Sequence, residues 1–254
     1  KRQTELGIAV VCVPDLWIRE VANHAFALIL ACNRKLLSLD YSIRSDNWTP
    51  IIPSPVGSIH GEILGIVGFG RIGRTLSARA RAFEMKVVAY DPYLPKEIFD
   101  EFGVESVSFD KLLEVSDYIS VHSPKTYETT NLFDNNAFTK MKKTAYLINT
   151  SRGSVINQDD LIQSLMNGQI AGAGLDVLKQ EPPLKNDPIL DMENVILTPH
   201  SSYFSDNAIR ELPVRCGREV GLVLTGKKPL NLVNPKAVSY THLRAHETEA
   251  DLVC

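Results

Sequence analysis

The sequence lacks any apolar run near the roughly 20 residues that a membrane-spanning helix needs. Its most apolar stretch, residues 25–31, is short and lies inside an amphipathic helical pattern. Acidic and basic residues nearly balance, with a formal net charge of -3 at pH 7, so the positive excess typical of a nucleic-acid binder is also missing. We therefore expect no membrane partner and no direct nucleic-acid partner.

Cysteine is scarce, and the residues present form no CxxC pair. Four scattered cysteines indicate reduced thiols in a cytoplasmic protein rather than a disulfide framework or a metal cluster. The chain opens on Lys1-Arg2-Gln3, without a Met and without the layout of a signal peptide. We interpret this opening as a truncated start.

The overall composition is that of a globular protein, with 254 residues of which 44% are hydrophobic. This length allows one large domain or two smaller ones. The first elements that the pattern predicts are a short strand over residues 5–13 and an amphipathic helix over residues 18–43. Pro50, Pro53, Pro55 and Gly57 then predict a hinge or linker.

Beyond Gly57, short apolar runs alternate with helical patterns, which predicts a parallel sheet covered on both faces. The expected strands are residues 63–69, 86–90, 118–122, 145–149, 170–177 and 195–198, and the expected helices are residues 71–83, 109–115, 135–141 and 158–167. The fold class that follows is α/β, a doubly wound parallel sheet of the Rossmann type.

A glycine-rich turn, Gly68-Phe69-Gly70-Arg71-Ile72-Gly73, lies between the first of these strands and its helix. The string G-x-G-x-x-G is weak alone, but this strand–turn–helix context is the one that a dinucleotide site requires. Gly68 permits the tight turn, Gly70 lets the backbone approach a pyrophosphate, and Gly73 lets the helix pack closely on the strand. The amides at the helix start favour the negative phosphates.

Asp91 ends the second strand, roughly 20 residues beyond the last glycine. A carboxylate there accepts hydrogen bonds from the adenosine ribose hydroxyls and repels a 2′-phosphate. Pro92 and Tyr93 follow it rather than Arg or Lys. The sequence therefore predicts NAD rather than NADP as the cofactor.

Residues suited to alcohol oxidation follow the later strands, where the loops at the carboxyl ends of a doubly wound sheet bind ligands. His200 suits proton transfer, and a carboxylate such as Glu181 beside it would favour its protonated form. The planar fork of Arg152 suits a substrate carboxylate. Taken alone, His24, His60 and His122 are more typical of ordinary surface or core histidines.

At this point the chain resembles the D-isomer-specific 2-hydroxyacid dehydrogenases, a family that includes phosphoglycerate dehydrogenase and the C-terminal-binding-protein corepressors. The resemblance runs from about Leu6 to Pro235. Its motifs are the glycine turn with Asp91, Val121-His122-Ser123-Pro124 leading to Thr129, Asn149 to Gly153, Gly174 to Val177, Glu181-Pro182 and Thr198-Pro199-His200.

The resemblance implies a role for each matched position. His200 would be the general acid/base, Glu181 its carboxylate partner, and Arg152 the residue that polarises the keto group and holds the carboxylate. Asp176 would bind the nicotinamide carboxamide. The expected cofactor-binding set is Gly68, Gly70, Arg71, Ile72, Gly73, Asp91, His122, Pro124, Thr129, Thr150, Arg152, Asp176 and His200.

Two features depart from the family pattern. Its members usually carry about 80 further residues before the point that matches Leu6, which would hold most of a substrate domain. Residues 236–254 have no counterpart in the family, and residues 238–248 among them resemble translated sequencing-adapter sequence. His242 and His246 there have zinc-site spacing, but we expect no metal site.

The domain organisation that we expect combines these observations. Residues 1–17 would be a remnant of a truncated second α/β domain, the substrate domain, and residues 18–205 the NAD-binding domain with a dimerisation helix and arm. Residues 206–235 would form a helix that returns to the substrate domain. Residues 236–254 would be a non-native or disordered tail, and the expected assembly is a homodimer.

Three functions stay open from the sequence. The leading one is an NAD-dependent enzyme that transfers a hydride between nicotinamide and C2 of a small D-2-hydroxy or 2-keto acid. The second is an NAD-sensing corepressor, which residues 198–205 and Val13-Pro14-Asp15 favour. The third is a folded but inactive fragment that lacks much of its substrate pocket.

Overall fold

The computed structural model describes residues 2–48 and 56–237. The predicted hinge at Pro50, Pro53 and Pro55 and the tail from residue 238 onward lie outside these residues. The chain divides into two compact units, one formed by the stretch up to Trp17 and the stretch from Phe204 onward, the other by Ile18–Tyr203.

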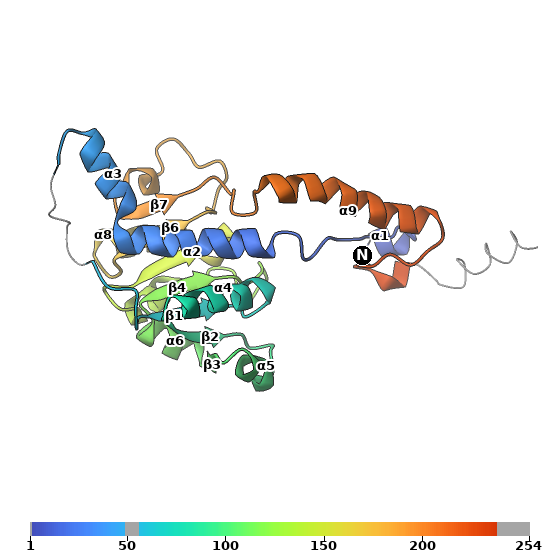
Figure 1. Cartoon of the computed structure of the whole chain (residues 1–254), viewed down its shortest axis with the longest axis horizontal. Coiled ribbons are helices and arrows are strands. Elements are labelled where there is room, and N and C mark those ends of the chain that lie inside the picture. The colour runs from blue at the N-terminus through green and yellow to red at the C-terminus, as the bar shows by residue number, and fades with distance from the viewer. Residues whose placement is uncertain (1, 49–55, 238–254) are drawn as a thin grey trace, which may run out of the picture. The chain divides into compact units, whose positions relative to one another are not determined.

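The larger unit contains a seven-stranded sheet in the order β3-β2-β1-β4-β5-β6-β7, formed by described residues (Figure 1). Every neighbouring pair is parallel. The strands are β1 (Ile63–Val67), β2 (Lys86–Tyr90), β3 (Glu105–Ser106), β4 (Tyr118–Val121), β5 (Tyr146–Asn149), β6 (Gly172–Leu175) and β7 (Val195–Leu197). The direction of winding reverses between β1 and β4, the place where such sheets bind ligands. The predicted doubly wound Rossmann-type sheet is confirmed.

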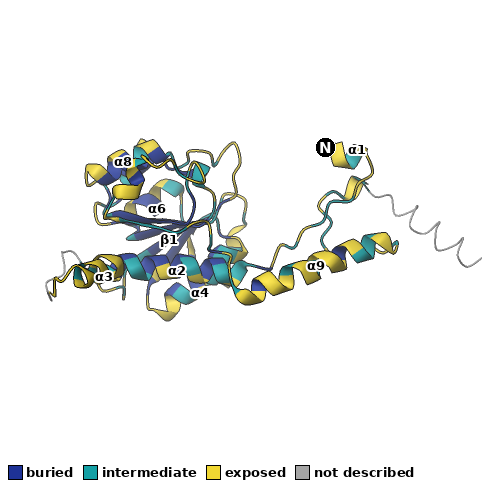
Figure 2. Cartoon of the chain, turned by 90° about the horizontal axis from the view of Figure 1, so that it is seen from above, coloured by how far each residue is buried: buried dark blue, intermediate teal, exposed yellow. Residues whose placement is uncertain are grey.

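Helices cover both faces of this sheet, and the strands supply both cores (Figure 2). Because successive side chains of a strand point to opposite faces, Ile66 packs with one group of helices and Val67 with the other. The first group is α2 (Ile18–Arg34), α4 (Arg71–Ala82) and α5 (Lys96–Glu101), and the second is α6 (Phe109–Val115), α7 (Asn135–Lys140) and α8 (Gln158–Met166). Burial on both faces explains why the strands read as continuous apolar runs.

The helix predicted over residues 18–43 is wrong as a single element. Lys35 interrupts it with φ 54°, so α2 ends at Arg34 and α3 (Leu36–Arg44) begins directly after the break. The Lys35 amine hydrogen-bonds to the Tyr146 hydroxyl and lies 4.9 Å from the centre of the tyrosine ring. These tertiary contacts stabilise a left-handed conformation that the helical periodicity gives no sign of.

The strand predicted over residues 5–13 is also wrong. The helix α1 (Arg2–Glu5) begins the smaller unit, and the apolar run after it forms only an isolated antiparallel bridge, Val11 with Leu232. A run of β-branched residues needs a neighbour of similar length to become a strand, and here the pairing is limited to one short segment.

The helix α9 (Asp206–Leu224) confirms the helix expected from about Asp206. Within the described residues, no helix is long and apolar enough to cross a membrane.

His122 follows β4 directly, and burial strongly affects the protonation of its ring. Its Nε2 lies 2.9 Å from the Ser120 hydroxyl, while its buried Nδ1 has no hydrogen-bond partner within the described residues. Burial penalises the charged imidazolium and lowers the pKa of His122 from 6.5 to about 4. The folded protein therefore holds this ring neutral.

The buried ring predicts acid sensitivity. Between pH 6.5 and about 4, the unfolded chain binds a proton at His122 that the folded chain does not. The contribution to stability is complete above pH 6.5 and declines by about 3 kcal/mol as the pH falls to 4. In urea unfolding at pH 7 and pH 5, His122→Gln should lose less stability than the unmodified protein. Equal losses in the two proteins would show that His122 does not titrate in this way.

Candidate active site

The glycine turn joins β1 to α4, and close packing fixes two of its glycines. Gly68 has φ +90°, and a Cβ there would lie 2.8 Å from the backbone of His122 and Ser123. At Gly73, a Cβ would lie 2.5 Å from the carbonyl oxygen of Gly68 and 3.0 Å from Ile66 Cγ2. Larger residues at either position would push the turn away from the sheet.

Gly70 differs from these two because a Cβ there meets nothing within 4 Å among the described residues. Gly70 is also the N-cap of α4, so the first amides of the helix follow it. Arg71 and Ile72 occupy the first turn of the helix, with Arg71 exposed. A bare backbone next to open space at a helix N-terminus fits a dinucleotide pyrophosphate.

Asp91 ties the glycine turn to the end of β2. Its Oδ2 accepts a hydrogen bond from the Phe69 amide at 3.0 Å, and its Oδ1 accepts one from the Tyr93 amide at 3.1 Å. The carboxylate also lines a cavity of about 360 Å³ beside Gly68. A cavity of this size next to the turn fits a nucleoside.

The opposite wall of this cavity comes from the loop after β4. Thr129 shapes that loop, since its hydroxyl donates to the Pro124 carbonyl at 2.6 Å and accepts from the Thr126 amide at 2.8 Å. Glu128 lies on the same wall and accepts a hydrogen bond from the Tyr93 hydroxyl. Among the described lining residues, the charged groups are Asp91 and Glu128, both acidic. The sequence pattern gave no reason to single out Glu128 or Tyr93.

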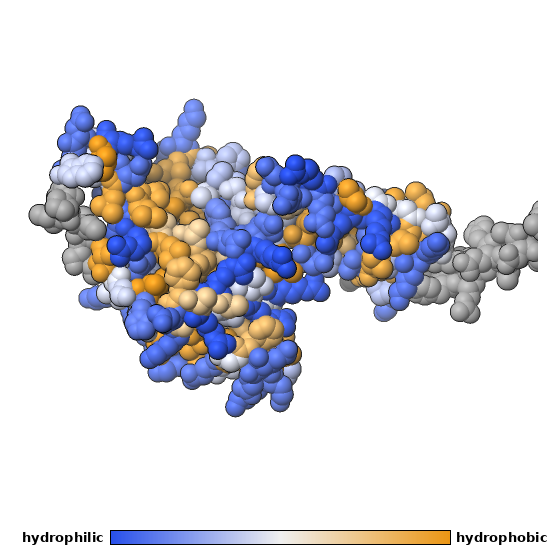
Figure 3. Space-filling view, in the orientation of Figure 1, coloured by the Kyte–Doolittle hydropathy of each residue, from blue (hydrophilic) through white to orange (hydrophobic). Residues whose placement is uncertain are grey.

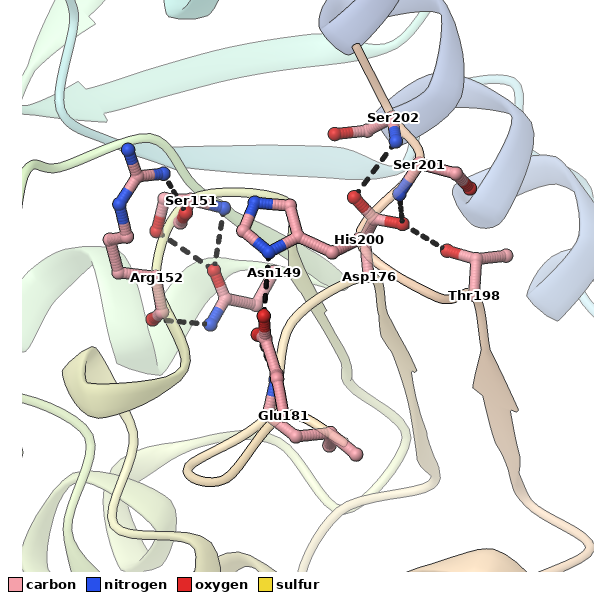
Figure 4. Close-up of polar contacts among 10 residues, drawn as sticks. Asn149, Ser151, Arg152, Asp176, Glu181, Thr198, His200, Ser201 and Ser202 are labelled. Atoms are coloured by element: carbon pink, nitrogen blue, oxygen red, sulfur yellow. Dashed lines mark hydrogen bonds and ion pairs between the residues drawn. The ribbon is translucent and has the colours of Figure 1, made fainter. Parts of the chain in front are cut away.

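Arg152 lies in the loop after β5, and buried Asn149 holds that loop (Figure 4). The Asn149 side-chain amide donates to the Arg152 carbonyl at 3.0 Å, while its oxygen accepts from the amide and hydroxyl of Ser151 at 2.9 and 2.8 Å. The Arg152 side chain is exposed, and its Nη1 donates to the Ser151 carbonyl at 2.6 Å. The sequence identifies Asn149 only as part of a motif and gives no sign of this anchoring role.

Thr150 completes this loop but makes no visible polar contact of its own. Its hydroxyl is buried and, like the Ser123 hydroxyl, has no hydrogen-bond partner within the described residues. They follow the neighbouring strands β4 and β5, and β4 borders the switch point of the sheet. Unpaired buried hydroxyls are uncommon. Among the described residues two of the three, Ser123 and Thr150, lie at the edge where a ligand is expected, and the third, Ser164, lies on α8.

His200 and Glu181 form a hydrogen-bonded pair. His200 Nδ1 lies 2.6 Å from Glu181 Oε2, and the other carboxylate oxygen accepts from the Leu178 amide at 3.0 Å. Their side chains are 44% and 38% exposed, so both are open to a ligand. His200 adopts φ 53°, a left-handed conformation that is rare for residues other than glycine.

Asp176, at the end of β6, is buried and organises the loop that carries His200 (Figure 4). Its Oδ1 accepts from the Thr198 hydroxyl at 2.5 Å and the Ser201 amide at 2.9 Å, and its Oδ2 accepts from the Ser202 amide at 2.9 Å. These bonds engage both oxygens of the carboxylate. Whether it also binds a nicotinamide carboxamide stays a prediction.

The structure thus gathers the predicted residues at one edge of the sheet, in two groups. Arg152, Asp176 and the His200–Glu181 pair follow the neighbouring strands β5, β6 and β7, while the glycine turn, Asp91, Pro124 and Thr129 surround the cavity near β1 and β2. In the described part of the chain, no group of His, Cys, Asp and Glu residues has the arrangement of a metal site.

Comparison with known proteins identifies the fold. Residues 26–202 match the sequence pattern of a family described as D-isomer specific 2-hydroxyacid dehydrogenase, NAD binding domain. The chain is 38% identical over 242 residues to a glyoxylate reductase of Korarchaeum cryptofilum, covering 94% of this chain and 73% of that protein. It is 37% identical over 237 residues to a D-3-phosphoglycerate dehydrogenase of Bacillus subtilis, covering 93% and 45%.

A solved structure agrees with these relatives. The crystal structure of D-lactate dehydrogenase from Aquifex aeolicus, complexed with NAD and lactic acid, matches with a TM-score of 0.84 and 30% identity, over 92% of this chain and 75% of that one. The fold of this chain is thus similar to that of a protein solved with NAD. The chain belongs to the D-isomer-specific 2-hydroxyacid dehydrogenase family and carries its NAD-binding domain.

Proposed function

We propose that the protein is an NAD-dependent oxidoreductase that transfers a hydride between nicotinamide and C2 of a small D-2-hydroxy or 2-keto acid. The observation that carries this proposal is the 2.6 Å pair of His200 and Glu181. This pair lies at the same sheet edge as Arg152 and the glycine turn. The relatives reported above are named as a reductase and as dehydrogenases, which supports an enzyme and gives no support to the corepressor alternative.

His200 would exchange the proton that accompanies hydride transfer. Bound nicotinamide supplies or accepts the hydride. Because the ionised Glu181 carboxylate only accepts hydrogen bonds, Nδ1 of His200 must carry a hydrogen. Nε2 is then the nitrogen that gives a proton to the keto oxygen in reduction, or takes the hydroxyl proton in oxidation.

Arg152 would orient the acid. Its guanidinium offers several fixed donors, which suit the substrate carboxylate and the neighbouring C2 oxygen. The Asn149 hydrogen bonds hold the loop from which it projects. Orientation of this kind lowers the entropic cost of bringing C2 into position for transfer.

The catalytic assignment is tested with purified protein, NADH and a panel of glyoxylate, hydroxypyruvate, pyruvate and phosphohydroxypyruvate. We expect NADH oxidation with at least one of these acids. His200→Ala should lower kcat by at least about 100-fold, since it removes the proton donor. His60→Ala is the matched control, because His60 is a surface residue that pairs with Glu84. No oxidation with any keto acid would count against the enzyme.

The glycine turn and Asp91 generate a test of cofactor binding. Gly70→Ala should weaken NADH binding with little change in stability, because its Cβ enters open space within the chain. Gly73→Ala should also destabilise the protein by roughly 1–3 kcal/mol, because its Cβ overlaps the Gly68 carbonyl.

Asp91→Ala should reduce the preference for NADH over NADPH, measured by fluorescence titration. An unchanged preference would remove Asp91 from the nucleotide site.

We also propose a homodimer formed through α2 and α3. Figure 3 shows hydrophobic side chains gathered over α3 and the adjoining end of α2. Leu36 and Leu37 are each 52% exposed, and Tyr41 and Ile43 on the same short helix are exposed as well. An apolar cluster of this kind is typical of a protein–protein contact.

The described cysteines are free, which supports a location in the reducing cytoplasm.

Sedimentation at micromolar concentration tests this assembly. We expect the unmodified protein to sediment as a dimer and the double variant Leu36→Glu, Leu37→Glu to sediment as a monomer, because buried charges without partners are costly. Met166→Glu, a change at an exposed apolar residue at the end of α8, should leave the dimer intact. A monomeric unmodified protein would refute the assembly.

A further inference from the structure

His24 connects the helix α2 to the loop that carries His200. It lies on the side of α2 that faces the end of β7, where its Nε2 is 2.9 Å from the Thr198 hydroxyl oxygen and 3.8 Å from Asp176 Oδ1. Its side chain is 25% exposed, so most of the ring is shielded from solvent. This contact joins residues 174 positions apart in the sequence.

The direction of these hydrogen bonds follows from the chemistry of the groups. All the bonds to the Asp176 carboxylate come from donors, as expected for its ionised form. The single hydroxyl hydrogen of Thr198 therefore points to Asp176, at 2.5 Å. Because Thr198 has no second hydrogen to offer, His24 must donate its own Nε2–H to the Thr198 oxygen.

Beyond Thr198 the contacts surround His200. Asp176 accepts from the amides of Ser201 and Ser202, and the His200 amide donates to the Asp176 backbone carbonyl at 2.8 Å. These bonds hold His200 in its left-handed conformation, with Nδ1 directed at Glu181. A side chain that fixes Thr198 and Asp176 therefore acts on the catalytic pair without touching a ligand.

We propose that His24 is a positioning residue for the His200 loop, acting by donating Nε2–H to Thr198. The effect on catalysis rests on the proposed function, whereas the ordering of the loop does not. The donor orients the threonine hydroxyl toward Asp176, and Asp176 then holds the amides on the far side of His200. Loss of the donor leaves Thr198 free to rotate and loosens residues 198–202.

The test compares His24→Leu, which removes the donor, with His24→Gln, whose side-chain amide offers an N–H at a similar reach. Amide hydrogen exchange of the peptide that covers residues 198–204 is measured by mass spectrometry, with no substrate required. We expect about tenfold faster exchange in His24→Leu, the effect of losing one hydrogen bond to a partly buried group, and near-normal exchange in His24→Gln. His60→Leu, a change at an exposed histidine, should match the unmodified protein.

Kinetic measurements distinguish a loss of positioning from a general loss of stability. In His24→Leu, kcat at saturating NADH should fall about tenfold while the Kd for NADH stays within about twofold, because the nucleotide cavity is unchanged. His24→Gln should restore kcat. Thr198→Val should mimic His24→Leu, and the two changes together should be no worse than either one, since they interrupt the same link.

The outcomes separate this proposal from the proposed function. Unchanged exchange in His24→Leu overturns the positioning role, and so does a failure of His24→Gln to restore exchange, or faster exchange with unchanged kcat. If the unmodified protein turns over no keto acid, the proposed function fails, and the exchange measurements still decide whether His24 orders the loop.

Discussion

Parallel pairing of β5, β6 and β7 is the constraint on which the site depends. Strands that run in the same direction end at the same edge, so residues that are far apart in sequence emerge next to one another there. Arg152, Asp176 and His200 each follow one of these strands within a few residues. Because β1 runs parallel to the other strands, the glycine turn that follows it lies at the same edge. The catalytic chemistry therefore needs no long loops to converge.

Buried polar residues then hold the loops that carry Arg152 and His200 in one conformation. Asn149 and Asp176 are each almost fully buried. The Asn149 side chain bonds to backbone groups of the loop that follows it, and the Asp176 carboxylate bonds to amides of the loop after β7. A buried amide or carboxylate with all its bonds made stabilises one loop conformation, because any other conformation would leave it unpaired in a low dielectric. Gly153 adds a steric requirement, since a Cβ there would lie 1.9 Å from the Leu178 carbonyl oxygen. The loop of Arg152 thus passes directly against the segment that leads to Glu181.

The sequence predicted the sheet, and the edge at which the candidate site residues gather, better than it predicted the connections around them. Strands buried on both faces and the glycine turn have local signatures, so β2 and α6 appear at the expected residues. The break at Lys35 depends on Tyr146, more than 100 residues away, and periodicity within a helix cannot report such a contact. The short elements α5 and β3 went unpredicted because their few residues carry too little pattern. His24 looked like an ordinary histidine for the same reason, since its partner Thr198 is distant in sequence.

Charge is distributed unevenly along the site, and this distribution favours one orientation of its ligands. At the nucleoside end, Asp91 and Glu128 line the cavity, and no lysine or arginine is found among the described lining residues. Two carboxylates favour the hydroxyls of an unmodified ribose and disfavour an added phosphate. At the other end the exposed guanidinium of Arg152 attracts a carboxylate, and the negative charge of Glu181 is directed into His200 rather than toward the ligand. Under the proposed function, an anionic acid would be attracted to the end of the site where His200 lies and repelled from the end proposed for the nucleoside.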